Sequence, residues 1–168
     1  LKLASNLDLK FESVPYKNKL SVYLDNIEVS AELRTEETAE LASKFAMIGP
    51  LRESLLLRQQ KFKQPPGLVA DGRDMGTVVF TDAPVKIFLT ASAEERGRRR
   101  YEQLRSKGFN ASLPALIDDI QARDERDSNR TVAPLRPADD AKVIDSTALS
   151  IDEVRDVILS ILRESGLI

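Results

Sequence analysis

The sequence predicts an α/β fold in which helices cover a mostly parallel sheet. Short apolar runs that suit strands alternate with longer segments whose apolar residues recur at helical spacing. Capping residues, glycine and proline separate these segments, so that most of the expected helices have a recognisable start or end. Alternation of this kind is typical of parallel sheets, because the connection between two parallel strands usually contains a helix.

The first third of the chain is expected to form a small sheet followed by two helices. Three short strands are expected, at 8–13, 20–24 and 27–30. Thr35 can cap a helix that runs to about Ala46, and Gly49-Pro50 separates this helix from a second one. The second helix carries leucines at near-helical spacing and stops at the proline-rich segment 64–67.

The remaining chain is expected to alternate strands with helices. Extended segments are expected at 68–71, 78–80, 85–89 and 142–145. Two capping boxes are expected to begin helices, Ser92 with Glu95 and Ser150 with Glu153. The first of these helices ends at Gly108, a further helix runs over 113–129, and the last carries an apolar stripe that begins at Ile151.

Composition limits the chemistry available to these 168 residues. They contain no cysteine and no histidine, so disulfides, thiolate metal sites and histidine bases are excluded from them. Any chemistry depends on carboxylates, arginine, lysine, hydroxyls, backbone groups or a hard cation. The net charge of −2 does not favour nucleic-acid binding, and no apolar stretch approaches the length of a membrane span. The absence of cysteine suits a reducing cytoplasm.

The segment Asp71-Gly72-Arg73-Asp74 is the first candidate site. It follows the apolar run 67–70, which is expected to be a buried strand. Ligands of open α/β sheets bind at the carboxyl ends of strands, where an arginine suits phosphate and carboxylates can hold donors or a hydrated metal. The alternative is a polar junction between a strand and a loop, with aspartate and glycine as turn residues.

A second candidate site lies on the helix at 113–129 and just beyond it. Leu116 and Ile120 lie on the face expected to pack inward, and the same face continues to Arg123, Asp127 and Arg130. Unpaired buried charge costs several kcal/mol, so this change from aliphatic to charged residues indicates a ligand that carries phosphate and ribose. The alternative is an ordinary ion-paired helix surface.

Arginines also gather in the helix that precedes this one. Arg96, Arg98, Arg99, Arg100 and Arg105 lie in one stretch, and each of them alone is compatible with a solvated helix face. Two arginine-bearing helices joined at Gly108 would together suit a mobile cover over a polyanion.

These motifs, taken together, closely resemble bacterial cytidylate kinase. The segments that carry the resemblance are Asp71 to Phe80, Asp82 to Leu89, Arg123 to Arg130 and Asp145-Ser146-Thr147. The resemblance is specific across 67–150, continues through 32–62 and weakens before residue 30. It implies the three-layer fold of nucleoside monophosphate kinases, with a parallel sheet. It also implies phosphoryl transfer from ATP to CMP or dCMP with Mg²⁺, by a cytoplasmic monomer that binds no nucleic acid and no membrane.

The resemblance further implies a division of the chain into four parts. Residues 1–46 would form the monophosphate-binding insertion with its small antiparallel sheet, and 93–135 a lid-like helical region. Residues 47–92 and 136–168 would form the two parts of the core.

The resemblance assigns roles to individual residues. Ser43, Arg52 and Asp74 would read the cytosine edge, and uracil would leave the acceptors unpaired because it lacks the exocyclic amine. Arg123 and Asp127 would hold the sugar hydroxyls. The remaining roles are a clamp on the CMP phosphate by Arg73 and Arg130, lid contacts to the transferring group by Arg96, Arg99 and Arg100, and ordering of hydrated magnesium by Asp71.

One element of the family pattern is absent from the 168 residues. The family begins with a strand and a P-loop that holds the ATP phosphates, whereas no G-x-x-x-x-G-K-[ST] pattern occurs here. We therefore expect the fold without its first strand and P-loop, an additional N-terminal segment in the parent protein, and no kinase activity from these residues alone. Two other functions stay open: an inactive module that binds a nucleoside monophosphate, and a kinase for UMP or AMP.

Overall fold

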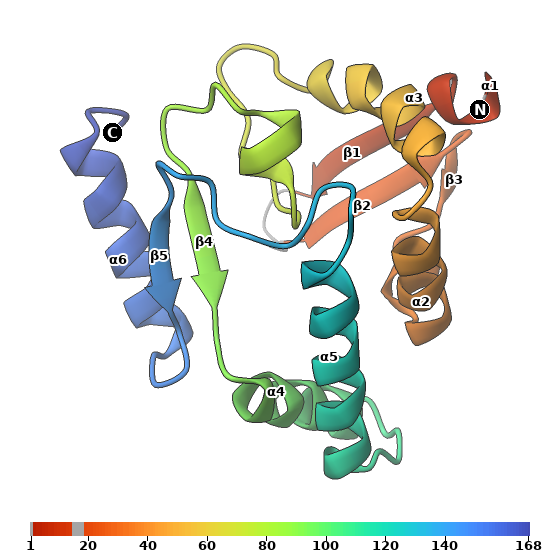
Figure 1. Ribbon diagram of the computed structural model, residues 1–168, viewed down its shortest axis with the longest axis vertical. Helices are drawn as coiled ribbons and strands as arrows, with labels where there is room; N and C mark the ends of the chain where they lie inside the picture. Colours follow the sequence, from red (N-terminus) through yellow and green to blue (C-terminus); the bar gives the residue numbers. More distant parts are fainter. Residues whose placement is uncertain (1, 15–18) are drawn as a thin grey trace. The chain divides into compact units, whose positions relative to one another are not determined.

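The computed structural model describes residues 2–14 and 19–168 (Figure 1). The chain divides into two compact units, Leu1–Val69 and Ala70–Ile168. Helices and strands alternate along the chain, and the second unit contains a parallel strand pair, so the predicted α/β class is confirmed.

The first unit combines a small antiparallel sheet with helices. Its sheet has the order β1-β2-β3, with β1 at Leu9–Val14, β2 at Lys19–Leu24 and β3 at Ile27–Glu28. Asp25 and Asn26 join β2 to β3 with φ values of 50° and 65°, which aspartate and asparagine tolerate better than most residues. The helical elements are α1 at Lys2–Ser5, η1 at Glu32–Arg34, α2 at Glu36–Phe45 and α3 at Gly49–Gln60.

The two longer helices of this unit begin as the sequence predicts. The Thr35 hydroxyl accepts a hydrogen bond from the Thr38 amide at 3.2 Å, which caps α2. Pro50 lies in the first turn of α3. Backbone amides in the first turn have no acceptor within the helix, so a proline there costs no helical hydrogen bond. The ring of Phe62, just beyond α3, packs edge to face on Phe11 of β1 at 5.1 Å between centroids.

The second unit is built around two parallel strands. β4 (Ile87–Thr90) pairs with β5 (Lys142–Asp145), and the two strands run side by side in Figure 1. Thr90 and Asp145 lie opposite each other at the carboxyl ends. The helical elements are η2 at Met75–Val79, α4 at Ala93–Ser106, α5 at Leu113–Ser128 and α6 at Ile151–Glu164. The buried apolar residues are Val79, Phe80, Ala91 and Ile144.

Two predicted extended segments are absent from the structure. The predicted strand at 68–71 is wrong: these residues make no strand pairing, and Val69 is fully exposed. An apolar run becomes a strand only where another strand pairs with its backbone, and no described strand lies beside it. The extended piece predicted at 78–80 is also wrong, because Met75–Val79 form a single π-helical turn, a form often found at functional sites.

The two predicted capping boxes differ in outcome. The box at Ser150 and Glu153 is complete. At the start of α4, the Ser92 hydroxyl accepts from the Glu95 amide at 3.1 Å, but arginines bind the Glu95 carboxylate, so only half of that box is formed. The apolar stripe of α6 is partly solvent-exposed, since Ile151 has 90% of its surface exposed.

Candidate functional site

The carboxylate of Asp127 is the centre of the candidate site in the second unit. Asp127 lies in the last turn of α5 and is 2% exposed. Arg73 donates a hydrogen bond to Oδ2, and Nη2 of Arg130 lies 2.8 Å from Oδ1. Nε of Arg123 lies 3.8 Å from Oδ2, within ion-pair range but too far for a hydrogen bond. The structure therefore brings together four of the predicted site residues.

The local sequence explains how this cluster forms. Arg123 and Asp127 are one helical turn apart on α5, so their side chains share a face. Arg130 follows the end of the helix and also donates from Nε to the Asp127 carbonyl at 3.3 Å. The backbone amide of Leu135 donates to the same carbonyl at 2.8 Å, which secures the chain as it leaves α5.

Arg73 reaches the cluster from the segment that precedes η2. Its neighbour Asp74 is half-buried, and the Asp74 carbonyl accepts from the amides of Val78 at 2.9 Å and Val79 at 3.3 Å. The π-helical turn thus holds the Arg73-Asp74 pair in place. Asp71 is exposed on the same segment.

The other two predicted base-reading residues belong to the first unit. Arg52 lines a cavity of about 260 Å³ between α2 and α3, whose walls are mainly apolar, and its Nη1 donates to the Ala46 carbonyl at 3.4 Å. Ser43 lies on α2 and is half-buried. The roles of these two residues stay predictions.

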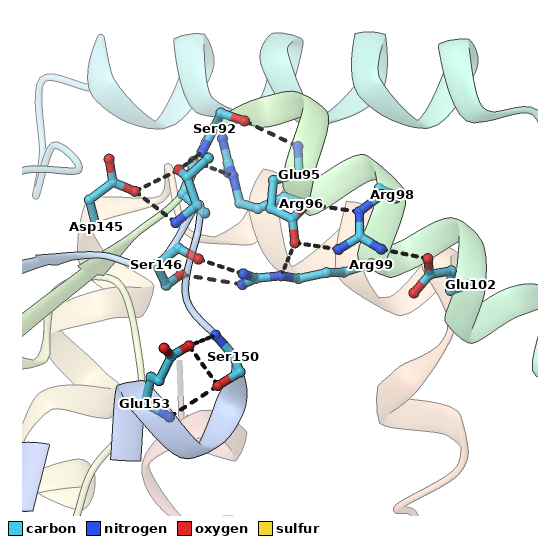
Figure 2. A network of polar contacts seen from close by, with 12 residues as sticks. Ser92, Glu95, Arg96, Arg98, Arg99, Glu102, Asp145, Ser146, Ser150 and Glu153 are labelled. Carbon is cyan, nitrogen blue, oxygen red and sulfur yellow. Dashed lines mark hydrogen bonds and ion pairs between the residues drawn. The ribbon is translucent and has the colours of Figure 1, made fainter. Parts of the chain in front are cut away.

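The three predicted lid arginines of α4 have partners within the protein. Arg96 donates from Nη1 to Asp124 of α5 at 3.1 Å and from Nε to the Ala91 carbonyl at 3.1 Å. Arg100 donates to the Gln103 side chain at 2.5 Å. Arg99 contacts both Glu95 and Ser146 (Figure 2). Arg96 and Arg99 therefore connect α4 to neighbouring segments, and their contact with ATP stays a prediction.

Two acidic groups near α4 have lowered pKa values. Hydrogen bonds from Arg98 first and then Arg99 lower the pKa of Glu95 to about 2. The pKa of Asp145, at the end of β5, is lowered by hydrogen bonds from the Thr147 hydroxyl and amide. Both carboxylates are therefore ionised at neutral pH.

Sequence reasoning missed the connection that Glu95 makes. The spacing from Ser92 to Glu95 is that of a capping box. This pattern predicts that the Glu95 carboxylate binds the backbone at the start of the helix, and it does not predict a contact with arginine. The positions of Arg98 and Arg99, three and four residues later on the same helix, are the sequence signal for the arginine pairing. No local signal in the sequence indicates that Arg99 also binds the buried Ser146, because Ser146 lies far along the chain.

A metal site made of several acidic side chains is absent from the described residues. No group of three or more acidic side chains that could hold a metal occurs in 2–14 or 19–168. Mg²⁺ often takes only one or two protein carboxylates and fills its other positions with water and phosphate oxygens. The exposed carboxylate of Asp71 is compatible with that kind of binding.

Helices long and apolar enough to cross a membrane are absent from the described part of the chain.

Comparison with known proteins gives one consistent family. The cytidylate kinase family model matches residues 1–164. A cytidylate kinase from Photorhabdus laumondii is 57% identical over 162 residues, which cover 96% of this chain and 70% of the relative. A cytidylate kinase from Pseudomonas savastanoi is 53% identical over 165 residues, which cover 98% and 72%. One from Aeromonas hydrophila is 55% identical over 158 residues, which cover 94% and 68%.

Proposed function

This chain belongs to the cytidylate kinase family, and we propose that it serves the transfer of a phosphoryl group from ATP to CMP or dCMP, giving CDP or dCDP. Phosphoryl transfer depends mainly on positioning and on neutralising negative charge, and arginine and carboxylate side chains supply both without histidine. The observation that carries the proposal is the pair of arginines, Arg73 and Arg130, that share the buried carboxylate of Asp127.

The phosphate of CMP is assigned to Arg73 and Arg130. Two guanidinium groups balanced by one carboxylate retain an excess of positive charge, which suits a phosphate. Asp127 holds both groups in place before the nucleotide arrives, so less conformational freedom is lost on binding. The half-exposed Arg73 is open to a ligand. The side chain of Arg130 is only 8% exposed, so its charge depends more on Asp127 for stabilisation.

The sugar and the base are assigned to the remaining predicted residues. Arg123 and Asp127 can bind sugar hydroxyls, one as donor and the other as acceptor. Arg52 can donate to the ring carbonyl and nitrogen of cytosine, while Ser43 or Asp74 accepts from its exocyclic amine. Uracil carries a second carbonyl in place of that amine and would face an acceptor, which favours CMP over UMP.

ATP is the co-substrate of this family. We assign Arg96, Arg99 and Arg100 to its phosphates and Asp71 to water molecules around Mg²⁺. When bound, the metal would neutralise phosphate charge during transfer. We also propose that the protein acts as a monomer in the cytoplasm, where nucleotides are available. We also keep the prediction that the 168 residues alone have no kinase activity, because their sequence contains no P-loop pattern.

Calorimetric titration of the chain with CMP, cytidine, UMP and AMP tests the assignment. We expect CMP to bind more tightly than UMP. Arg73→Met should raise the Kd for CMP about tenfold, as expected for the loss of a charge-assisted hydrogen bond, and leave cytidine binding unchanged. The matched control is Arg126→Met, which removes an exposed arginine of α5.

The results distinguish the proposal from the alternative of a kinase for UMP or AMP. Tighter binding of UMP or AMP than of CMP would overturn the cytosine assignment in favour of another monophosphate kinase. Equal loss of CMP and cytidine binding in Arg73→Met would overturn the phosphate assignment.

A further inference from the structure

Glu95, in the first turn of α4, holds two arginines at once. Its Oε1 accepts from Nε of Arg99 at 2.7 Å and from Nη2 of Arg98 at 2.8 Å, while its Oε2 accepts from Nε of Arg98 at 2.8 Å. The Glu95 side chain is 15% exposed, and both arginine side chains are more exposed than it is. Glu95 itself has no role among the residues assigned to the nucleotides above.

Arg99 extends from Glu95 to the segment that follows β5. Its Nη2 donates to the Ser146 carbonyl at 2.6 Å and its Nη1 donates to the Ser146 hydroxyl at 3.2 Å (Figure 2). Ser146 is 2% exposed and is itself fixed to β4, because its hydroxyl and its amide donate to the Thr90 carbonyl at 3.0 and 2.7 Å. Glu95 therefore orients a guanidinium whose other donors bind an immobile part of the sheet.

A second contact fixes the same end of α4. The amide of Ser92 donates to the Thr147 hydroxyl at 2.9 Å, and that hydroxyl donates to Asp145 at 2.6 Å. The start of α4 is thus attached at two points to the loop after β5. We call the contacts of Glu95, Arg99 and Ser146 the α4 clasp.

The orientation of α4 determines where α5 lies. Gly97 of α4 is buried so closely against Ile117 of α5 that a Cβ on Gly97 would lie 2.5 Å from Cγ1 of Ile117. Arg96 of α4 donates to Asp124 of α5 at 3.1 Å. One turn beyond Asp124 lies Asp127, the centre of the candidate site, so a rotation of α4 would move the carboxylate that holds Arg73 and Arg130.

We propose that Glu95 is a positioning residue for the monophosphate site, acting through Arg99 and the α4 clasp. It touches no substrate in this proposal. It holds Arg99 on Ser146, the clasp fixes α4 against the ends of β4 and β5, and α4 in turn sets α5. The inference rests on the proposed function, because it takes the Asp127 cluster to be the binding site for CMP.

A double-mutant cycle on CMP affinity tests the inference. Glu95→Ala should raise the calorimetric Kd for CMP about fivefold, the lower end of typical coupling between distant sites. Glu102→Ala is the matched control, because Glu102 also binds Arg98 on α4, whereas the hydrogen-bond partners of Arg99 among the described residues are Glu95 and Ser146. In an Arg99→Ala background, Glu95→Ala should cause no further loss, since Glu95 acts only through Arg99.

Hydrogen exchange separates positioning from simple destabilisation. In Glu95→Ala, we expect faster exchange of the first amides of α4, with unchanged protection of the α5 amides.

The inference is overturned if Glu95→Ala binds CMP like the parent chain, if Glu102→Ala loses as much affinity, or if the losses of Glu95→Ala and Arg99→Ala add. Absence of CMP binding by the chain without substitutions would instead overturn the proposed function, and this inference with it.

Discussion

Replacing Asp127 with asparagine tests whether the buried carboxylate stabilises the second unit. The side chains of Asp127 and Arg130 are 3% and 8% exposed, and their charged atoms are 2.8 Å apart. Removal of one partner from such a buried pair costs about 3–5 kcal/mol, because the other charge stays buried. Asparagine keeps the size of the side chain and an oxygen that can accept a hydrogen bond from Arg130. This remaining hydrogen bond retains about 1 kcal/mol of stability. Arg73 is 36% exposed, so the loss of its ion pair adds little to this cost. We therefore expect Asp127→Asn to lower the free energy of unfolding by about 2–4 kcal/mol.

Asp124→Asn is the matched control on the same helix. Asp124 binds Arg96 through two nitrogens, but these side chains are 28% and 35% exposed. Water can replace the lost contacts there, so the expected cost is about 1 kcal/mol or less. The two substitutions make the same chemical change in the same helix, so their difference measures the effect of burial.

Native-state hydrogen exchange of the α5 amides is the suitable assay, because it reports the opening free energy of this unit separately from the first. Asp127→Asn should lower that free energy by at least about 1 kcal/mol more than Asp124→Asn does. Equal losses in the two variants would refute the argument from burial. So would an Asp127→Asn variant as stable as the parent chain.

Two further predictions concern α4. The pKa of Glu95 is lowered to about 2 from its usual 4.5, chiefly by Arg98, so its ionised form stabilises the folded state. That stability is complete above about pH 4.5 and is lost as the pH falls toward 2, so an acid unfolding series should be steeper for the parent chain than for Glu95→Gln. Gly97→Ala should lower the melting temperature, because overpacking against Ile117 costs about 1–3 kcal/mol and the gain in helix propensity is at most about 1 kcal/mol.

Both predictions have internal controls. Glu102→Gln changes an exposed carboxylate of the same helix and should leave the acid unfolding slope of the parent chain nearly unchanged. If Glu95→Gln also leaves it unchanged, the arginine pairing does not contribute to stability. For the glycine, Ile117→Ala opens space for the new methyl group, so the double variant should lose less than the two single losses combined. A Gly97→Ala chain more stable than the parent would show that Ile117 moves aside without cost.

Helix ends and charged helix faces were predictable because their causes are local. Thr35, Ser150 and Gly108 were correctly identified as end signals, since a hydroxyl near free amides or a glycine at positive φ acts within a few residues. The face that leads to Asp127 followed from the helical repeat in the same way. The strand predicted at 68–71 failed because strand formation depends on a pairing partner elsewhere in the chain.

The sequence by itself determined the order of most helices and strands, the absence of histidine and cysteine chemistry, and the residue types that suit phosphate. Only the tertiary structure decided that Arg73 shares the carboxylate of Asp127, 54 residues later, and that Arg99 binds Ser146 instead of solvent. Such contacts form when packing brings distant segments together. Hydrogen bonding and charge then select partners by distance in space, which no local spacing encodes.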